Sequence, residues 1–138
     1  LQPGLYQNQW ENWLNRDSIE CDFMYVTEVN AGVDWQKVYS DDIEYRISVE
    51  EMGWMIKRLR INPVKYKDYI GLVYIEENYC KTKPLGTLSL VFFNVNDLQP
   101  LLIKEYSTKP IGAGFLNYWG YVDNYAHLMF KAIKKELK

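Results

Sequence analysis

The sequence predicts an α+β fold, in which the N- and C-terminal helices pack on one face of a single antiparallel β-sheet and a further helix lies elsewhere. Two observations carry this. Helical apolar spacing occurs at both ends of the chain and once between them, while short apolar runs with turn residues between them fill the rest. Short links favour antiparallel neighbours. Because 48% of the 138 residues are apolar and 25% are charged, we expect residues 1–138 to form a single globular domain.

The first expected element is a helix over residues 5–15. Tyr6, Trp10, Trp13 and Leu14 recur at helical spacing, and a polar stretch follows them. Two tryptophans three residues apart give this short segment more aromatic area than core packing needs. They indicate either core residues or an exposed aromatic platform.

A β-hairpin is expected next. Residues 21–29 alternate and are rich in β-forming side chains, and Asn30, Ala31 and Gly32 supply turn chemistry. Residues 33–39, with Trp35, would form the second strand.

A second helix is predicted over residues 49–59. Ser48 followed by Glu51 forms a capping-box pattern. Proline disfavours helical geometry in the residue before it, so Asn62 and Pro63 mark the end of this region. The apolar residues at helical spacing are Val49, Met52, Ile56 and Leu59.

Three strands are expected after this helix, over residues 69–75, 87–93 and 101–106. The segments between them, 78–86 and 94–100, carry turn residues. Three sequential strands with such links predict antiparallel pairing.

The chain should end in a long amphipathic helix over residues 117–137, reached through a loop at 107–114 that contains Pro110 and two glycines. Asn117 is a good N-cap. Cations near the C-terminal end would complement the helix dipole, and they are Lys131, Lys134, Lys135 and Lys138.

Composition excludes several classes of protein. A net charge of −2 argues against a general nucleic-acid or membrane-surface binder, although one local run is basic. Two cysteines without a CxxC pattern and a single histidine predict no metal site, and we expect no cofactor. A cytoplasmic protein without a membrane span is expected. The basic run comprises Lys57, Arg58, Arg60, Lys65 and Lys67.

No catalytic constellation is evident, so we do not expect an enzyme. His127 lies in the middle of the polar face of its helix, where a surface histidine is the simplest explanation. Glu50 and Glu51 stand at a helix start, where capping and dipole roles explain carboxylates better than acid-base chemistry.

The order of elements and several local patterns resemble the profilin family of small actin-monomer-binding proteins. The similar features are two aromatics three residues apart in the first helix, a turn followed by tryptophan, a helix that opens on a hydroxyl residue before acidic ones, a late strand that ends in tyrosine, and a glycine-to-asparagine entry into the last helix. In the same order, the residues that carry these features are Trp10 and Trp13; Gly32 to Trp35; Ser48, Glu50 and Glu51; Leu101 to Tyr106; and Gly114 to Asn117.

This resemblance implies a monomer that binds actin or an actin-like monomer through the late strands, the loop at 107–114 and the entry of the last helix. The implied actin-binding residues are Lys104, Lys109, Tyr118, Asn124 and Lys131. Lys104 departs from the family, which usually has glycine there.

The resemblance also implies a groove for proline-rich segments, and phosphoinositides are a further possible partner class. Polyproline II segments are preorganised and bind flat aromatic faces with a few donors. The candidate residues are Trp10, Trp13, Trp35 and His127. The last helix can be aligned with the family in two ways. One alignment places His127 in the groove, and the other places Ala132 there.

Two alternatives stay open. In a carrier of lipids or other hydrophobic ligands, the apolar arc of the last helix would line a cavity against a curved sheet. A small inhibitor or immunity protein would also be mildly acidic and lack catalytic residues.

Overall fold

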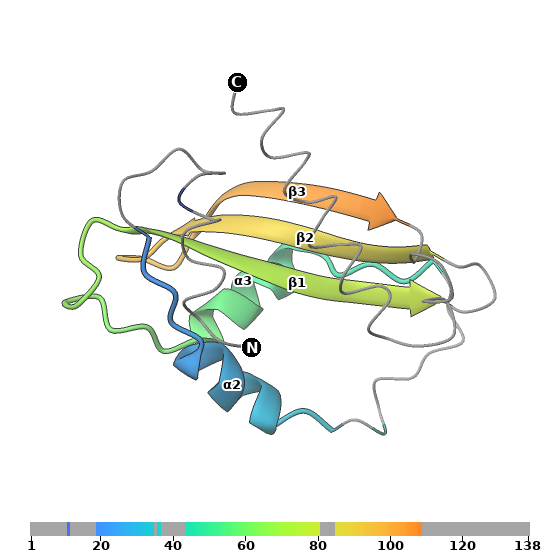
Figure 1. Ribbon diagram of the computed structural model, residues 1–138, viewed down its shortest axis with the longest axis horizontal. Helices are drawn as coiled ribbons and strands as arrows, with labels where there is room; N and C mark the ends of the chain where they lie inside the picture. Colours follow the sequence, from blue (N-terminus) through green and yellow to red (C-terminus); the bar gives the residue numbers. More distant parts are fainter. Residues whose placement is uncertain (1–10, 12–18, 35, 37–43, 81–84, 109–138) are drawn as a thin grey trace.

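The computed structural model describes residues 11, 19–34, 36, 44–80 and 85–108 (Figure 1). This part of the chain is a small α+β fold with two helices and a three-stranded antiparallel sheet, so the predicted fold class is confirmed at this level. The elements are α2 (Met24–Ala31), α3 (Val49–Arg58), β1 (Ile70–Cys80), β2 (Leu85–Asn94) and β3 (Pro100–Thr108).

The sheet has the strand order β1-β2-β3, so strands that are neighbours in space are also neighbours in the sequence. All three predicted strands are present; β2 and β3 extend beyond their predicted bounds at both ends, whereas β1 begins one residue later than predicted and ends five residues later. In particular, β1 continues to Cys80 and β2 starts at Leu85, which shortens the predicted turn segment at 78–86. The predicted loop at 107–114 is wrong in its first two residues, because Ser107 and Thr108 belong to β3.

The main core lies between one face of the sheet and the helices. Ile56 of α3 is completely buried and packs in one cluster with Val91 and Phe93 of β2. Tyr25 and Val29 of α2 pack against the same cluster, and Figure 1 shows both helices on the same side of the sheet. The opposite face, which we call the distal face, is therefore not covered by either described helix.

The capping box predicted for α3 is confirmed. Ser48 Oγ accepts a hydrogen bond from the Glu51 backbone N–H at 3.2 Å, and Glu51 Oε2 accepts one from the Ser48 N–H at 2.8 Å. Such a cap stabilises a helix by about 1 kcal/mol. The helix ends at Arg58, one residue before its predicted end, and Arg60 follows in the left-handed region at φ 49°.

The predicted β-hairpin is wrong, because α2 occupies most of its first strand. Asp22 Oδ1 accepts a hydrogen bond from the Met24 N–H at 3.0 Å at the start of this helix. Tyr25, Val26 and Val29 of α2 then pack against the core cluster, and this packing outweighs the strand preference of the two valines. Of residues 33–39, the structure describes Val33, Asp34 and Gln36, none of which lies in a strand.

An irregularity in β1 links the sheet to the segment before α3. The register shifts between Glu76 and Asn78, which leaves Glu77 as an extra residue in the strand. Its carboxylate accepts hydrogen bonds from the Ser89 hydroxyl at 2.6 Å and from the Ile47 N–H at 3.1 Å. Because Ser89 is almost fully buried, this carboxylate satisfies a hydroxyl that would otherwise lack a partner in the core.

The expected terminal helices lie outside the described residues, apart from Glu11, which is helical. Their packing beside each other on one face of the sheet therefore stays a prediction.

Candidate functional site

Of the residues that the sequence nominates for binding, the structure describes Lys104, which lies in β3. The others lie outside the described residues, so their roles stay predictions. For the polyproline groove these are Trp10, Trp13, Trp35 and His127, and for the actin-binding face they are Lys109, Tyr118, Asn124 and Lys131.

Lys104 lies on the distal face. It pairs with Leu90 of β2, and Leu90 pairs in turn with Tyr74 of β1, so the three residues form one row across the sheet. Side chains alternate between the two faces of a strand. Val91 and Ile103, the next residues along β2 and β3, face the helices, and the row therefore points the other way.

The distal face is apolar at its centre and polar or aromatic at its sides. Leu88 and Leu90 are nearly fully buried, yet they do not belong to the core cluster formed with α3. Tyr74 at one side is 47% exposed, and Lys104 at the other side is half-buried. Because Leu90 is almost fully buried, the side chains of this row that a protein partner can reach are Tyr74 and Lys104.

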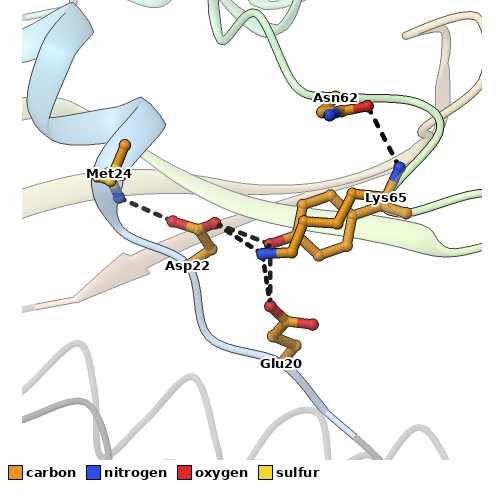
Figure 2. A network of polar contacts seen from close by, with 6 residues as sticks. Glu20, Asp22, Met24, Asn62 and Lys65 are labelled. Carbon is orange, nitrogen blue, oxygen red and sulfur yellow. Dashed lines mark hydrogen bonds and ion pairs between the residues drawn. The ribbon is translucent and has the colours of Figure 1, made fainter.

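A second cluster, the Tyr66 cluster, was not predicted; its members are Glu20, Asp22, Lys65 and Tyr66 (Figure 2). Lys65 Nζ donates hydrogen bonds to Glu20 Oε1 at 2.9 Å and to the Tyr66 hydroxyl at 2.5 Å. The phenol proton has two acceptors, Asp22 Oδ2 at 2.7 Å and Glu20 Oε1 at 2.9 Å. The cluster thus joins the segment before α2 to the turn after α3.

A local turn positions the backbone of Lys65 and Tyr66 in the cluster. Asn62 Oδ1 accepts hydrogen bonds from the backbone N–H groups of Val64 and Lys65, which shapes the turn that carries Lys65 and Tyr66. The Tyr66 ring is 7% exposed and belongs to the core cluster, so its hydroxyl is held at the rim of the core. Lys65 Nζ also lies 4.4 Å from the centre of this ring.

These contacts shift the pKa of each titrating group. The hydrogen bond from Lys65, and then that from Tyr66, lowers the pKa of Glu20. The hydrogen bond from Tyr66 is the main cause of the lowered pKa of Asp22. The contact with Lys65 lowers the pKa of Tyr66, but burial and the two carboxylates raise it more, to about 12.

The cluster is best explained as a structural tie. Every charged group in it has a partner of opposite charge or a hydroxyl, and the Glu20 and Lys65 side chains are about half exposed. Among the described residues, no group of three or more His, Cys, Asp or Glu side chains could hold a metal ion. Nothing in this geometry leaves an acid or a base poised for a substrate.

We expect the stability of the protein to fall as the pH is lowered from about 5 to about 2, because folded Asp22 and Glu20 resist protonation more than the unfolded carboxyl groups do. A carboxyl group with a depressed pKa contributes its stability above its unfolded pKa and loses it as the pH falls through the folded pKa. Chemical denaturation at a series of pH values measures this. Asp22→Asn should flatten the dependence.

Glu28→Gln is the control for this experiment, since Glu28 is an exposed carboxylate of α2 outside the Tyr66 cluster. It should leave the acid dependence as it is in the original chain. An Asp22→Asn variant that keeps the full acid dependence would contradict the stabilising role of the cluster.

The Tyr66 cluster could not be predicted from the sequence. Lys65 belongs to the basic run of the sequence, and its partners Glu20 and Asp22 lie more than 40 residues away. A charge pattern within one segment carries no signal for such a pairing.

None of the helices in the described ranges is long and apolar enough to cross a membrane. Comparison of the chain with models of protein families, with curated proteins and with solved structures gave no match. The function must therefore be argued from the residues described above.

Proposed function

We propose that this protein is a profilin-like binder of actin or an actin-like monomer, and that it uses the edge of the sheet formed by β3, where Lys104 lies. The observation that carries the proposal is the position of Lys104 in a row with Leu90 and Tyr74 on the face opposite α2 and α3. Leu90 at the centre of this row is buried, so the accessible groups are the Tyr74 ring at one side and the Lys104 ammonium group at the other.

The arrangement of the described helices supports the same proposal. Since α2 and α3 share one face, the distal face stays available to the amphipathic segment expected at 117–137 and to the binding surface at its entry. β3 ends at Thr108, so Lys109 directly follows the strand that carries Lys104. The proposed surface is thus continuous along the sequence.

Electrostatics set a condition on this binding. The chain carries a net charge of −2, so long-range attraction to an acidic partner is unfavourable. The affinity must come from a local patch in which lysines stand beside aromatic side chains. Lys104, which lies in the same row as Tyr74 but two strands away from it, supplies one of these lysines.

The packing of the described core bears on the carrier alternative. Between the sheet and α3, the side chains of Ile56, Val91 and Phe93 are at most 2% exposed and form one cluster. A filled interface at this position argues against a ligand cavity under α3. The carrier alternative places its cavity against the segment at 117–137, which lies outside the described residues, so that alternative stays open.

The proposal predicts that Lys109→Glu and Lys131→Glu each weaken binding to monomeric actin by about threefold to tenfold at low salt, with a smaller loss at high salt. The charge of each lysine would lie at the rim of the interface, where ionic screening is strong. Titration of fluorescently labelled monomeric actin measures the affinities. A pull-down with the original chain establishes binding first.

Lys57→Glu is the matched control, because Lys57 lies on α3, on the other side of the sheet from the proposed surface. It should leave actin binding unchanged. The assigned face is wrong if Lys57→Glu weakens binding as much as the two other reversals do, and the function itself is wrong if the original chain does not bind actin.

A further inference from the structure

Trp54 is an unexpected residue at the centre of the outer face of α3. At 100° per residue, the core residues Met52 and Ile56 lie about 160° away from it around the helix. Trp54 is 68% exposed, and the described residues give its indole ring no hydrogen bond or ring contact. Neither core packing nor capping of the helix accounts for a tryptophan at this position.

The charges around Trp54 are arranged symmetrically. Glu50 and Glu51 precede it by four and three residues, and Lys57 and Arg58 follow it by three and four. All four lie within about 60° of Trp54 around the helix, so they form one strip with it, which we call the Trp54 strip. Among the described residues, neither Lys57 nor Arg58 has an ion-pair partner.

The helix dipole explains only part of this pattern. Acidic residues in the first turn and basic residues in the last turn complement the dipole, whatever else the helix does. Glu51 has an additional role in the capping box. The dipole does not explain why an exposed tryptophan stands midway between the two pairs of charges.

We propose that the Trp54 strip binds the same strip of a second copy of this chain, with the two α3 helices antiparallel across a two-fold axis near Trp54. In that arrangement Glu50 of each copy lies nearest Lys57 of the other, and Glu51 lies nearest Arg58, because each of these pairs shares one side of the strip. Both copies use the same surface, as an isologous interface requires. The two tryptophans then meet near the axis, where interface hot spots concentrate.

Other partners would match only half of the strip. A phosphate-bearing surface, of a lipid bilayer or of nucleic acid, would attract Lys57 and Arg58 but repel Glu50 and Glu51. An acidic peptide has the same defect. The symmetric spacing of the charges therefore favours a second copy.

The size of the strip indicates weak association. A helix of ten residues is about 15 Å long, and one pair of such helices buries much less than the roughly 800 Å² per partner of a standard interface. We therefore expect self-association that depends on concentration and weakens with salt. It revises the expectation of a strict monomer, and it does not rest on the proposed binding of actin.

Analytical ultracentrifugation of the full chain from micromolar to millimolar concentration tests this proposal. At low salt, the average mass should rise with concentration, and Trp54→Ala should lower the association constant by about tenfold or more. Lys67→Glu, which changes an exposed lysine outside the Trp54 strip, should leave association unchanged.

Charge swapping gives the sharper test. Glu50→Lys and Lys57→Glu should each weaken self-association, because each creates a like-charge contact across the two-fold axis. An equimolar mixture of the two variants should associate more strongly than either variant alone, because both contacts become attractive in the mixed pair. Thermal unfolding of each variant checks that α3 stays folded.

Three results would overturn the proposal. The first is a mass that stays at that of one chain up to millimolar concentration, and the second is a mixture that associates no more strongly than its components. In the third, the chain sediments with vesicles that contain phosphatidylserine in a way that Trp54→Ala abolishes, which would identify the strip as a lipid-binding surface instead.

Discussion

Replacing Gly71 by alanine is expected to lower the free energy of unfolding by about 3 kcal/mol. Gly71 in β1 pairs directly with Phe93 in β2, and the ring of Phe93 lies over the glycine. An added Cβ would stand 2.6 Å from Cε1 of that ring and still closer to Cζ and Cε2. The ring is 2% exposed within the core cluster, so it cannot move aside without disturbing its neighbours.

Urea denaturation of Gly71→Ala measures this loss, and two other glycines, Gly32 and Gly53, supply controls. In Gly32→Ala the new Cβ would meet no atom closer than the Val29 carbonyl oxygen at 3.6 Å, so little change is expected. Gly53→Ala, inside α3 and with its nearest neighbour at 3.9 Å, should stabilise the protein by about 0.5–1 kcal/mol.

A second substitution shows whether the clash is the cause. Phe93→Leu should cost stability in the original chain, but it should cost less, or nothing, when combined with Gly71→Ala. This coupling is what two residues in direct contact produce. Additive effects, or a Gly71→Ala variant within about 0.5 kcal/mol of the original chain, would show that the ring does not occupy this position.

Ile56→Ala is expected to cost about 2–5 kcal/mol, since it removes a completely buried side chain and leaves a cavity between α3 and the sheet. Met55→Ala is the matched control, because Met55 is the preceding residue in the same helix but is 38% exposed. It should cost much less. Thermal unfolding of both variants compares them, and similar losses would place the core-facing side of α3 elsewhere.

The parts of the fold that could be predicted are those with local signals. Ser48 and Glu51 stand three residues apart, and their side chains alone specify where α3 begins. The runs that became β1, β2 and β3 combine β-forming residues with clear turns between them. α2 could not be predicted, because the strand preference of Val26, Thr27 and Val29 was overruled by a core that forms from residues far along the chain.

The candidate sites show the same division. Placing Lys104 on a strand needed only its neighbours in the sequence. Its position opposite Leu90 depends on the register between β2 and β3. That register shifts between Phe92 and Phe93 of β2, and the register between β1 and β2 shifts at Glu77. Beyond such a shift, simple alternation assigns residues to the wrong face. The Tyr66 cluster depends on pairings that only the folded chain creates.

The strand order β1-β2-β3 also bears on how the chain reaches this structure. Each pairing in the sheet closes a short loop, and a short loop costs little entropy to close. The bond between Glu20 and Lys65 joins residues 45 positions apart and repays its entropic cost only once both segments are in place. The pairings of β1 with β2 and of β2 with β3 are local, and local pairings favour fast folding. The sheet can therefore assemble first, and the segment that leads into α2 then packs against it.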